Sequence, residues 1–452
     1  MMDVEFSHPR KLGSLILFRR NAAGLTQEEL ADRTGLSVRT IRDIERGRTV
    51  TPSQSSIRLL ASALERAAAN DNDIFAVAAA NRVSALMMGP DPGLSRAHDA
   101  SEVINPSQTP AGVADFTARS AEVDAASRML ATGVSRHSGR AAIAAIVGMP
   151  GIGKTTLAVR VAHLVAGIFP DGQLYANLQG SDRPVPAQET VPRFLHNLCS
   201  GMSAIRDGAY GAYEEYLGRY QSLLAGKRIL IVLDDAYDAA QVHPLIPSSP
   251  HCGILITSRN RLPDLEGAYP LTLGTLMAQD ARDLLARIIG PDRIAAEAEA
   301  TDAVLKACSG LPLAIRIAGA RLASRPHWKI ATLAERLASS ERVVDELRLG
   351  SLSVTACLRR SYDQLLQFGD VGRGAREIFG FIGQLDSAVF TVDDIAAATD
   401  RKAADIENYL EFLVDASLLD LAPPGSYRAH DLIRLFCRTY CSPTAEKDSC
   451  AS

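Results

Sequence analysis

A glycine-rich stretch at residues 146–158, IVGMPGIGKTTLA, has the residue types and spacing of a phosphate-binding loop. Its glycines can adopt positive φ and leave no Cβ in the way, so successive backbone N–H groups can point at one anion. In the spacing Gly-x-x-x-x-Gly-Lys-Thr, the lysine neutralises the β- and γ-phosphates of a nucleotide and the threonine hydroxyl holds Mg²⁺. The residues expected to contact the nucleotide, with Thr155 as the metal ligand, are Gly148, Gly151, Gly153, Lys154, Thr155 and Thr156.

The segments on either side of the loop support this interpretation. Residues 142–147 read as a buried strand, and residues 155–166 read as a helix with apolar side chains three and four residues apart. The alternative is an ordinary glycine-rich turn between a strand and a helix. That alternative leaves the lysine and threonine in register unexplained.

A second apolar segment, RILIVLDDA at residues 228–236, ends in two carboxylates. Residues 229–233 are typical of a parallel strand that is buried on both faces. Carboxylates at the C-terminal end of such a strand face the crevice where α/β sheets bind ligands. We expect Asp234 to be a metal partner and Asp235 to orient or deprotonate an attacking water. Without the phosphate loop, the same pair would be read as a solvated acidic turn.

A third segment, GILITSR at residues 253–259, reads as another strand. It ends in Ser258 and Arg259, and a cation at this point could sense the γ-phosphate as part of the catalytic machinery. An arginine at a strand end is otherwise usually a surface residue. The alternation of strands and helices from about 113 to 265 predicts an α/β domain with a parallel sheet.

The composition fits several domains in one chain. At 452 residues we expect three or four domains, and the net charge of −4 excludes a polycation, although residues 1–60 carry ten Lys or Arg against seven Asp or Glu. The seven cysteines are scattered without a CxxC pair, which argues against a disulfide framework or zinc site; Cys437 and Cys441 are expected to be two packed thiols. No apolar run approaches the ~18 residues of a membrane span. The N-terminus has no signal sequence, so we expect a cytoplasmic protein without a membrane partner.

The N-terminal segment LTQEELADRTGLSVRTIRDIERG, residues 25–47, predicts two short helices joined by a tight turn. Thr26 caps the first helix, and Glu29, three residues later, completes a capping box. The turn lies at residues 34–36, and Ser37 caps the second helix.

The second of these helices has the side chains of a DNA recognition helix. Its apolar residues recur at 38, 41 and 44, and this face must pack inward. A short helix with two outward arginines and a hydroxyl near its N-terminus suits the major groove, and a glutamine at the start of the first helix could contact phosphate. The residues expected at DNA are Gln27, Ser37, Arg39, Thr40 and Arg42. The alternative is a helical adaptor whose charged face is only solvated.

Two known families resemble this chain and together cover most of it. Residues 11–66 resemble the phage-repressor, Cro-like (XRE-family) helix-turn-helix. Residues 113–440 resemble the NB-ARC module of the STAND class of signalling ATPases, in the form found in actinomycete transcriptional regulators. The implied fold is multidomain: an all-α helix-turn-helix, an α/β P-loop NTPase with a parallel sheet, a helical domain and a winged helix. The expected ranges are 1–88 for the helix-turn-helix domain, 89–112 for a linker, 113–265 for the nucleotide-binding domain, 266–345 for the helical domain, 346–440 for the winged helix and 441–452 for a tail.

The motif DFTARSAEV at residues 115–123 is similar to the first motif of the NB-ARC family. Ala118 and Ser120 replace the usual Gly and Glu of that motif. The resemblance implies that Phe116 and Arg119 contact the adenine side of the nucleotide.

Two later motifs extend the resemblance. GLPLA at residues 310–314 matches a motif whose proline, here Pro312, packs near the adenine in relatives; by itself, Pro312 could simply begin a helix. RAHDLIRLF at residues 428–436 resembles the Met-His-Asp motif, whose histidine reaches the β-phosphate of ADP from a winged-helix domain. This implies the same role for His430, although a lone histidine beside a hairpin is usually structural. Asp431 is expected to hold local backbone.

These motifs together predict a nucleotide-switched transcriptional regulator. ADP would stabilise a closed form, exchange for ATP would release it, and hydrolysis would be at most a slow reset. The open form would self-associate and bring several helix-turn-helix units to repeated half-sites of double-stranded DNA. STAND proteins usually continue into a sensor of repeats, yet this sequence ends twelve residues after Tyr440, so either a separate sensor protein acts or the N-terminal unit and the nucleotide suffice.

Two other functions compete with this one. The alternative is a STAND signalling ATPase whose N-terminal unit recruits a protein partner instead of DNA. A metabolic ATPase or kinase is poorly supported, because no substrate-pocket motif accompanies the phosphate loop.

Overall fold

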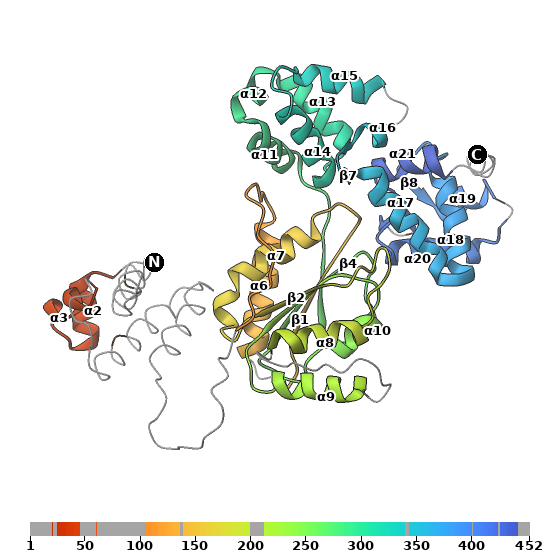
Figure 1. The fold of residues 1–452 in the computed structure, drawn as a ribbon. Helices are drawn as coiled ribbons and strands as arrows, with labels where there is room; N and C mark the ends of the chain where they lie inside the picture. The colour runs from red at the N-terminus through yellow and green to blue at the C-terminus, as the bar shows by residue number, and fades with distance from the viewer. Residues whose placement is uncertain are drawn as a thin grey trace, which may run out of the picture. The chain divides into compact units, whose positions relative to one another are not determined.

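The structure is a computed structural model that describes residues 20, 25–45, 60, 105–135, 139–198, 212–339, 343–399, 401–423 and 425–441. The chain divides into an N-terminal unit that ends at Val103 and a larger unit that begins at Ile104 (Figure 1), with the short segment Leu164–Asp171 grouped with the first.

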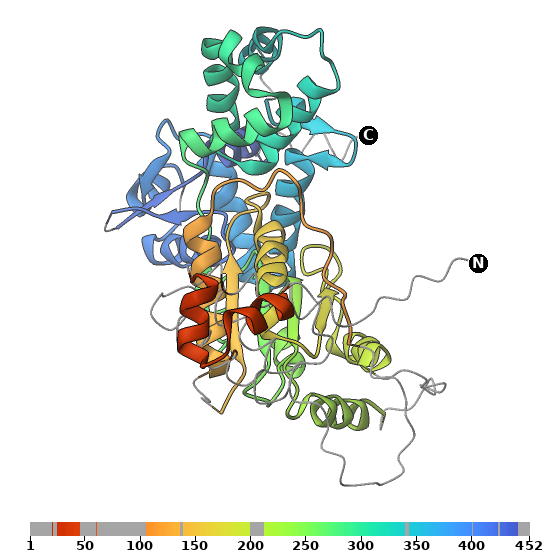
Figure 2. The same cartoon turned by 90° about the vertical axis from the view of Figure 1, so that its left-hand side faces the viewer.

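The described part of the N-terminal unit is built around two short helices, α2 (Gln27–Thr34) and α3 (Val38–Glu45), shown in red in Figure 2. The predicted capping box is confirmed, because the Thr26 hydroxyl accepts from Glu29 N at 3.1 Å and the Glu29 carboxylate accepts from Thr26 N at 2.7 Å. Gly35 ends α2 with φ of 68°. The apolar face predicted for the second helix is the one that packs inward, and the buried cluster consists of Leu25, Leu30, Ala31, Ile41, Ile44 and Leu60.

The larger unit contains the predicted parallel sheet, in the strand order β2-β3-β4-β1-β5. All neighbouring strands run parallel. The strands are β1 (Ala142–Val147), β2 (Gln173–Asn177), β3 (Leu230–Ala236), β4 (Gly253–Ser258) and β5 (Ala268–Thr272). Every residue of β1 and of β4 is buried, which explains why their sequences are continuous apolar runs.

Strand β3 is longer than the sequence predicts. The expected strand ended at residue 233, whereas pairing with β4 continues to Ala236 through an irregularity after Leu233. Asp234 and Asp235 therefore lie within the C-terminal end of the strand rather than after it. Both carboxylates accept side-chain hydrogen bonds there, and a polar residue can remain in a strand when its side chain has such partners.

Helices cover both faces of this sheet (Figure 1). One face packs on α8 (Ala187–Leu198) and α9 (Ala212–Leu224), where Phe194 and Tyr220 are fully buried and stack with ring centroids 6.0 Å apart. The other face carries α6 (Ser120–Ser135) and α7 (Lys154–Leu164). The predicted helix after the phosphate loop is thus present, beginning one residue earlier and ending two residues earlier than expected.

Two segments extend the sheet beyond the range expected from the sequence. Strand β5 pairs with β1 although it begins at Ala268, past the expected end of the nucleotide-binding domain at 265. Residues 105–112, expected to be linker, include Ser107, which bridges to Gln173 of β2, and Gln108, whose N–H donates to the Gln173 carbonyl at 3.1 Å. The exposed edge of β2 explains the second case, because its free backbone groups can pair with an additional segment.

After the sheet the chain is helical. The first group contains α11 (Ala278–Ile289), α12 (Pro291–Ala296), α13 (Ala298–Cys308), α14 (Pro312–Ala323), α15 (Ile330–Ser339) and α16 (Val343–Glu346). The second contains α17 (Val354–Gln364), α18 (Gly369–Ile382), α19 (Val392–Ala396), α20 (Ala403–Asp415) and α21 (Asp431–Tyr440). A two-stranded hairpin, β6 (Arg348–Leu349) with β7 (Leu352–Ser353), joins the two groups.

A three-stranded antiparallel sheet lies within the second helical group. β9 (Asp420–Leu421) pairs antiparallel with β10 (Ser426–Arg428), and β8 (Val389–Thr391) pairs with β10 on its other side. Cys437 and Cys441, on and just after α21, are buried free thiols, as expected. Among the described residues, no helix combines the length and apolar character needed to cross a bilayer.

Candidate functional site

The phosphate loop connects β1 to α7 and has the backbone that its sequence predicts. Gly148, Gly151 and Gly153 have φ of 148°, 79° and 97°. A Cβ at Gly148 would lie 2.8 Å from the Leu273 carbonyl oxygen, so both the conformation and the close approach exclude a side chain there.

Lys154 lies at the N-terminus of α7 with its ammonium group turned into the loop. Nζ donates to the carbonyl oxygens of Gly148 at 2.7 Å and Met149 at 3.1 Å. Burial, together with the positive charge of Arg259, lowers the pKa of Lys154 from 10.5 to about 8. A phosphate group beside Nζ would oppose both effects, so the surroundings of this lysine favour an anion.

Asp234 is buried and accepts three hydroxyl hydrogen bonds. Thr155 Oγ1 and Thr257 Oγ1 donate to Oδ1 at 2.7 and 2.6 Å, and the Tyr175 hydroxyl donates to Oδ2 at 2.9 Å. The loop threonine and the strand carboxylate predicted to serve Mg²⁺ are therefore in direct contact. This pair fits the metal, because Mg²⁺ prefers hydroxyl, carboxylate and phosphate oxygens. Sequence reasoning missed Tyr175 and Thr257.

Asp235 adopts a left-handed backbone, with φ of 54°. Its Oδ2 accepts from the Ser181 hydroxyl at 2.6 Å and from Ser181 N at 3.0 Å, while Oδ1 lies 3.6 Å from Arg259 Nε. A non-glycine residue in this conformation is held by its surroundings and occurs preferentially at functional sites. Here the carboxylate orients Arg259 and the loop after β2.

Arg259 also reaches the second helical group. Its NH1 nitrogen donates to the Ser361 hydroxyl at 2.7 Å and to the Cys357 carbonyl at 3.3 Å, both on α17. The arginine predicted to sense phosphate therefore lies between the sheet and α17.

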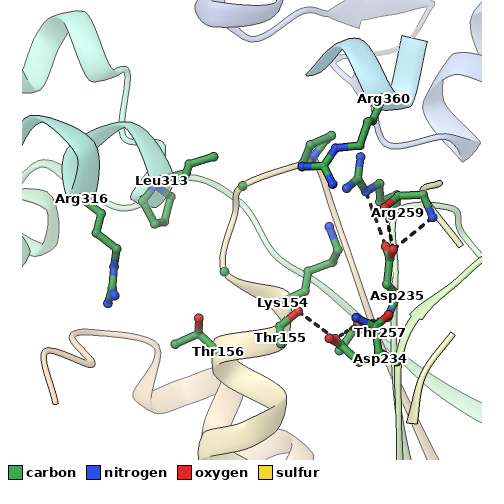
Figure 3. A pocket seen from close by; sticks show the side chains of 16 residues that line it. Lys154, Thr155, Thr156, Asp234, Asp235, Thr257, Arg259, Leu313, Arg316 and Arg360 are labelled. Atoms are coloured by element: carbon green, nitrogen blue, oxygen red, sulfur yellow. Dashed lines mark hydrogen bonds and ion pairs between the residues drawn. The ribbon is translucent and has the colours of Figure 1, made fainter. Parts of the chain in front are cut away.

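These groups line one cavity of about 380 Å³ (Figure 3), a size typical of small-molecule sites. The predicted residues that the structure brings together in its lining are Gly151, Gly153, Lys154, Thr155, Thr156, Asp234, Asp235, Arg259 and Pro312. Arg316 and Arg360 line the same cavity and were not predicted. An adjoining, more apolar pocket shares Thr156 and Pro312 with it.

The adjoining pocket contains the predicted adenine-side residues. Phe116 and Arg119 line it together with Ile152, Leu157, Leu276 and Leu284. Arg119 has φ of 66°, pairs with Glu122 at 2.9 Å and donates to the Gly274 carbonyl. The guanidinium thus has protein partners here, and its aliphatic stem remains available to the pocket.

The GLPLA segment contacts the phosphate loop directly. α14 begins at Pro312, and Leu313 N donates to the Gly151 carbonyl at 3.2 Å. The expectation that Pro312 starts a helix and the expectation that it lies at the nucleotide pocket therefore both hold geometrically.

His430 precedes α21 and contacts the residue before that GLPLA segment. Its Nδ1 accepts from Leu432 N at 3.2 Å, so the proton belongs on Nε2, which lies 2.9 Å from the Ser309 carbonyl oxygen. Burial lowers the pKa of His430 and thereby favours the neutral imidazole, whereas the hydrogen bond to the Ser309 carbonyl has the opposite, smaller effect. His430 does not line the cavity, and Asp431 accepts from the Ser309 hydroxyl at 3.2 Å.

The helix-turn-helix has an exposed polar face formed by its predicted residues. Thr40 N donates to the Ser37 hydroxyl at 3.1 Å, which confirms the expected cap, and the side chain of Arg39 is 92% exposed. Arg42 Nε donates to Gln27 Oε1 at 3.2 Å, so the structure brings these two together across the helices.

A buried ion pair fixes this arrangement. Gln27 Nε2 donates to Glu45 Oε2 at 2.6 Å, and Glu45 Oε1 lies 2.7 Å from Arg20 Nε. Sequence reasoning missed this pair because Arg20 and Glu45 are 25 residues apart and lack a pattern that links them.

Two family models match the chain. A helix-turn-helix model covers residues 16–68, and an NB-ARC domain model covers residues 120–292. The chain therefore contains an N-terminal helix-turn-helix and an NB-ARC domain, as its motifs implied.

The chain is similar to Regulatory protein AfsR of Streptomyces coelicolor, with 42% identity over 366 residues that cover 79% of this chain and 36% of that protein. Its similarity to Regulatory protein AfsR of Streptomyces griseus is 43% over 346 residues, covering 76% and 34%. This chain thus spans about a third of the length of these curated relatives. A solved structure, the Walker-type ATPase PABY2304 of Pyrococcus abyssi, covers 74% of this chain and 98% of its own at 12% identity, with a TM-score of 0.48.

Proposed function

We propose that the protein is a nucleotide-switched transcriptional regulator, which binds ADP or ATP in the cavity beside Lys154 and duplex DNA through α3. Lys154 neutralises the phosphates, and Thr155 and Asp234 hold Mg²⁺. Arg119 and Pro312 lie on the adenine side. Asp235 and Arg259 support at most slow hydrolysis.

The observation that supports a switch is a hydrogen-bonded connection between His430 and the phosphate loop. His430 bonds to the Ser309 carbonyl, and four residues later Leu313 N bonds to the Gly151 carbonyl. The Nε2–H of His430 can exchange one acceptor, the carbonyl, for another, a β-phosphate of ADP. We propose that this exchange defines the closed form.

The second helical group, with its three-stranded sheet β8-β10-β9, serves in this proposal as a winged helix. It lines the nucleotide cavity through Arg360 of α17, and through His430 it contacts Ser309, just before the GLPLA segment. Exchange of ADP for ATP breaks the His430 contact and opens the closed form, while α17 stays at the cavity, and the open form self-associates. Several helix-turn-helix units then bind repeated half-sites, with the stimulus coming from a separate sensor or from the nucleotide alone.

The DNA side of the proposal is supported by two outward arginines on α3, one of them fixed by Gln27. The test is selection from random duplex DNA, followed by binding isotherms at several salt concentrations. We expect one enriched sequence and a steep decrease in affinity with salt. No enrichment and no salt dependence would favour recruitment of a protein partner by the N-terminal unit.

A further inference from the structure

Arg360 lies on α17 and reaches the nucleotide cavity from the second helical group. Figure 3 shows it at the end of the cavity near Arg259 and Asp235, opposite Arg316 and Leu313. The carboxyl ends of β3 and β4 lie at this side, which is where α/β sheets bind ligands. Arg360 is thus about 200 residues away from the phosphate loop in sequence, yet it lines the same cavity as the loop.

The other cations of the cavity already have partners. Lys154 donates to two loop carbonyls, Arg259 pairs with Asp235 at 3.6 Å, and Arg316 pairs with Asp115 at 2.5 Å. Arg360 is exposed, and its Nε donates over a long 3.4 Å to the Ala356 carbonyl of its own helix. Across the described ranges of the chain, no carboxylate pairs with its guanidinium.

The helix that carries Arg360 is fixed at the cavity on both sides of this residue. Arg259 donates to the Cys357 carbonyl at 3.3 Å, before Arg360, and to the Ser361 hydroxyl at 2.7 Å, after it. The buried side chain of Gln364 donates to the Gly180 carbonyl at 2.8 Å, beside the Ser181–Asp235 contact. These contacts fix the helix backbone that carries Arg360, so an anion has to order only the arginine side chain.

We propose that Arg360 binds the terminal phosphate of a nucleoside triphosphate, which extends the nucleotide binding proposed above. Its planar guanidinium can donate two parallel hydrogen bonds to phosphate oxygens. A diphosphate lacks the group that would reach it. Arg360 thus discriminates ATP from ADP and makes α17 part of the triphosphate site.

The experiment compares Arg360→Ala with Arg359→Ala, in the full chain. Arg359 is the matched control, because it is the adjacent residue on α17 and has the same charge, yet its guanidinium lies over the ring of Tyr440 at 4.9 Å. Titrations use ADP and a non-hydrolysable ATP analogue, each with Mg²⁺, and a thermal melt checks folding.

We expect Arg360→Ala to weaken binding of the ATP analogue by about tenfold to a hundredfold, the usual loss for hydrogen bonds to a charged group. ADP affinity should change less than about twofold. Arg359→Ala should leave both affinities unchanged, and Arg360→Lys should restore part of the loss.

Each contrary result has a separate meaning. If the unmodified protein binds neither nucleotide, the proposed function fails and this inference fails with it. If it binds both and Arg360→Ala changes neither, only this inference is overturned. Equal losses for ADP and the ATP analogue would also overturn it, since they exclude selective contact with a terminal phosphate.

Discussion

Lys154 is a buried ammonium group that relies on carbonyl oxygens for its hydrogen bonds. Its pKa of about 8 lies near physiological pH, so its protonation state becomes a measurable property of the nucleotide site. In the folded protein Lys154 loses its proton at a lower pH than it does in the unfolded chain. Consequently, its contribution makes the free energy of unfolding rise between about pH 8 and 10.5, where the unfolded chain still holds the proton.

We expect triphosphate affinity to be nearly constant below about pH 7.5 and to fall as the pH rises through about 8. Above that pH the free protein carries a neutral amine, and binding to phosphate must then be accompanied by proton uptake. The decrease approaches about tenfold per pH unit. Titration of a fluorescent ATP analogue at about pH 7, 8 and 9 measures it.

The control for this prediction is Lys154→Ala. It should lower affinity at neutral pH by at least about tenfold and remove the step near pH 8, while the thermal melt stays cooperative. A folded variant that binds the analogue as tightly as the original protein would contradict the nucleotide assignment.

His430 has two neighbours that specify its tautomer, and its loss should affect one nucleotide state. We expect His430→Ala to bind ADP about tenfold more weakly and to release it faster, because the Ser309 carbonyl or the β-phosphate then lacks its donor. ATP affinity should change little. Dissociation of labelled ADP measures this; an unchanged rate would mean that His430 only caps α21.

At the scale of elements, the two arginines of α3 differ in how firmly their side chains are held. Arg42 is fixed through Gln27 to the Glu45–Arg20 pair, whereas Arg39 is 92% exposed beside Asp43. A pre-positioned side chain suits reading of a base edge, and a mobile one suits contact with phosphate.

We therefore expect Arg42→Ala to cost about 1–3 kcal/mol at the selected DNA site and little on scrambled DNA. Arg39→Ala should weaken both duplexes alike and reduce the salt slope by about one. Arg33→Ala, an exposed arginine in the last turn of α2, is the matched control. Isotherms on both duplexes decide, and no loss for any variant would favour a protein partner.

The elements that sequence predicted well are those whose local pattern matches their burial. β1 and β4 are buried apolar runs, and the capping box of α2 is a contiguous signal. β5 gave no such signal, because this edge strand contains Pro270 and is largely exposed, as edge positions permit. The extent of β3 depended on partners of Asp234 and Asp235 that are distant in sequence.

The site residues likewise divide into those in a contiguous motif, which sequence predicted, and those brought in by long-range contacts, which it did not. The loop glycines, Lys154 and Thr155 form a contiguous motif, so spacing alone predicted their neighbourhood. Arg360 lines the cavity, and Tyr175 and Ser361 contact its lining residues Asp234 and Arg259, all through tertiary packing. Single residues of these types on a strand or helix lack a distinguishing pattern. His430 was singled out only through a family resemblance, and its contact with Ser309 could not be read from spacing.

For the whole molecule, the account requires the nucleotide in the larger unit to control DNA binding by the smaller one. A ligand shifts such an equilibrium only through its different affinities for the two states. His430 and Arg360 provide the proposed difference, because one favours the diphosphate and the other the triphosphate. A shift from mostly closed to mostly open requires a few kcal/mol between them.

The central claim is tested most directly by DNA affinity in the two nucleotide states. The measurement is an isotherm on the selected duplex with two half-sites, using protein loaded with ADP or with a non-hydrolysable ATP analogue. The account predicts at least about tenfold tighter binding and larger complexes with the ATP analogue. Lys154→Ala should show no difference between the two nucleotides. Equal affinities and equal complex sizes for the unmodified protein in both states would contradict nucleotide control of DNA binding.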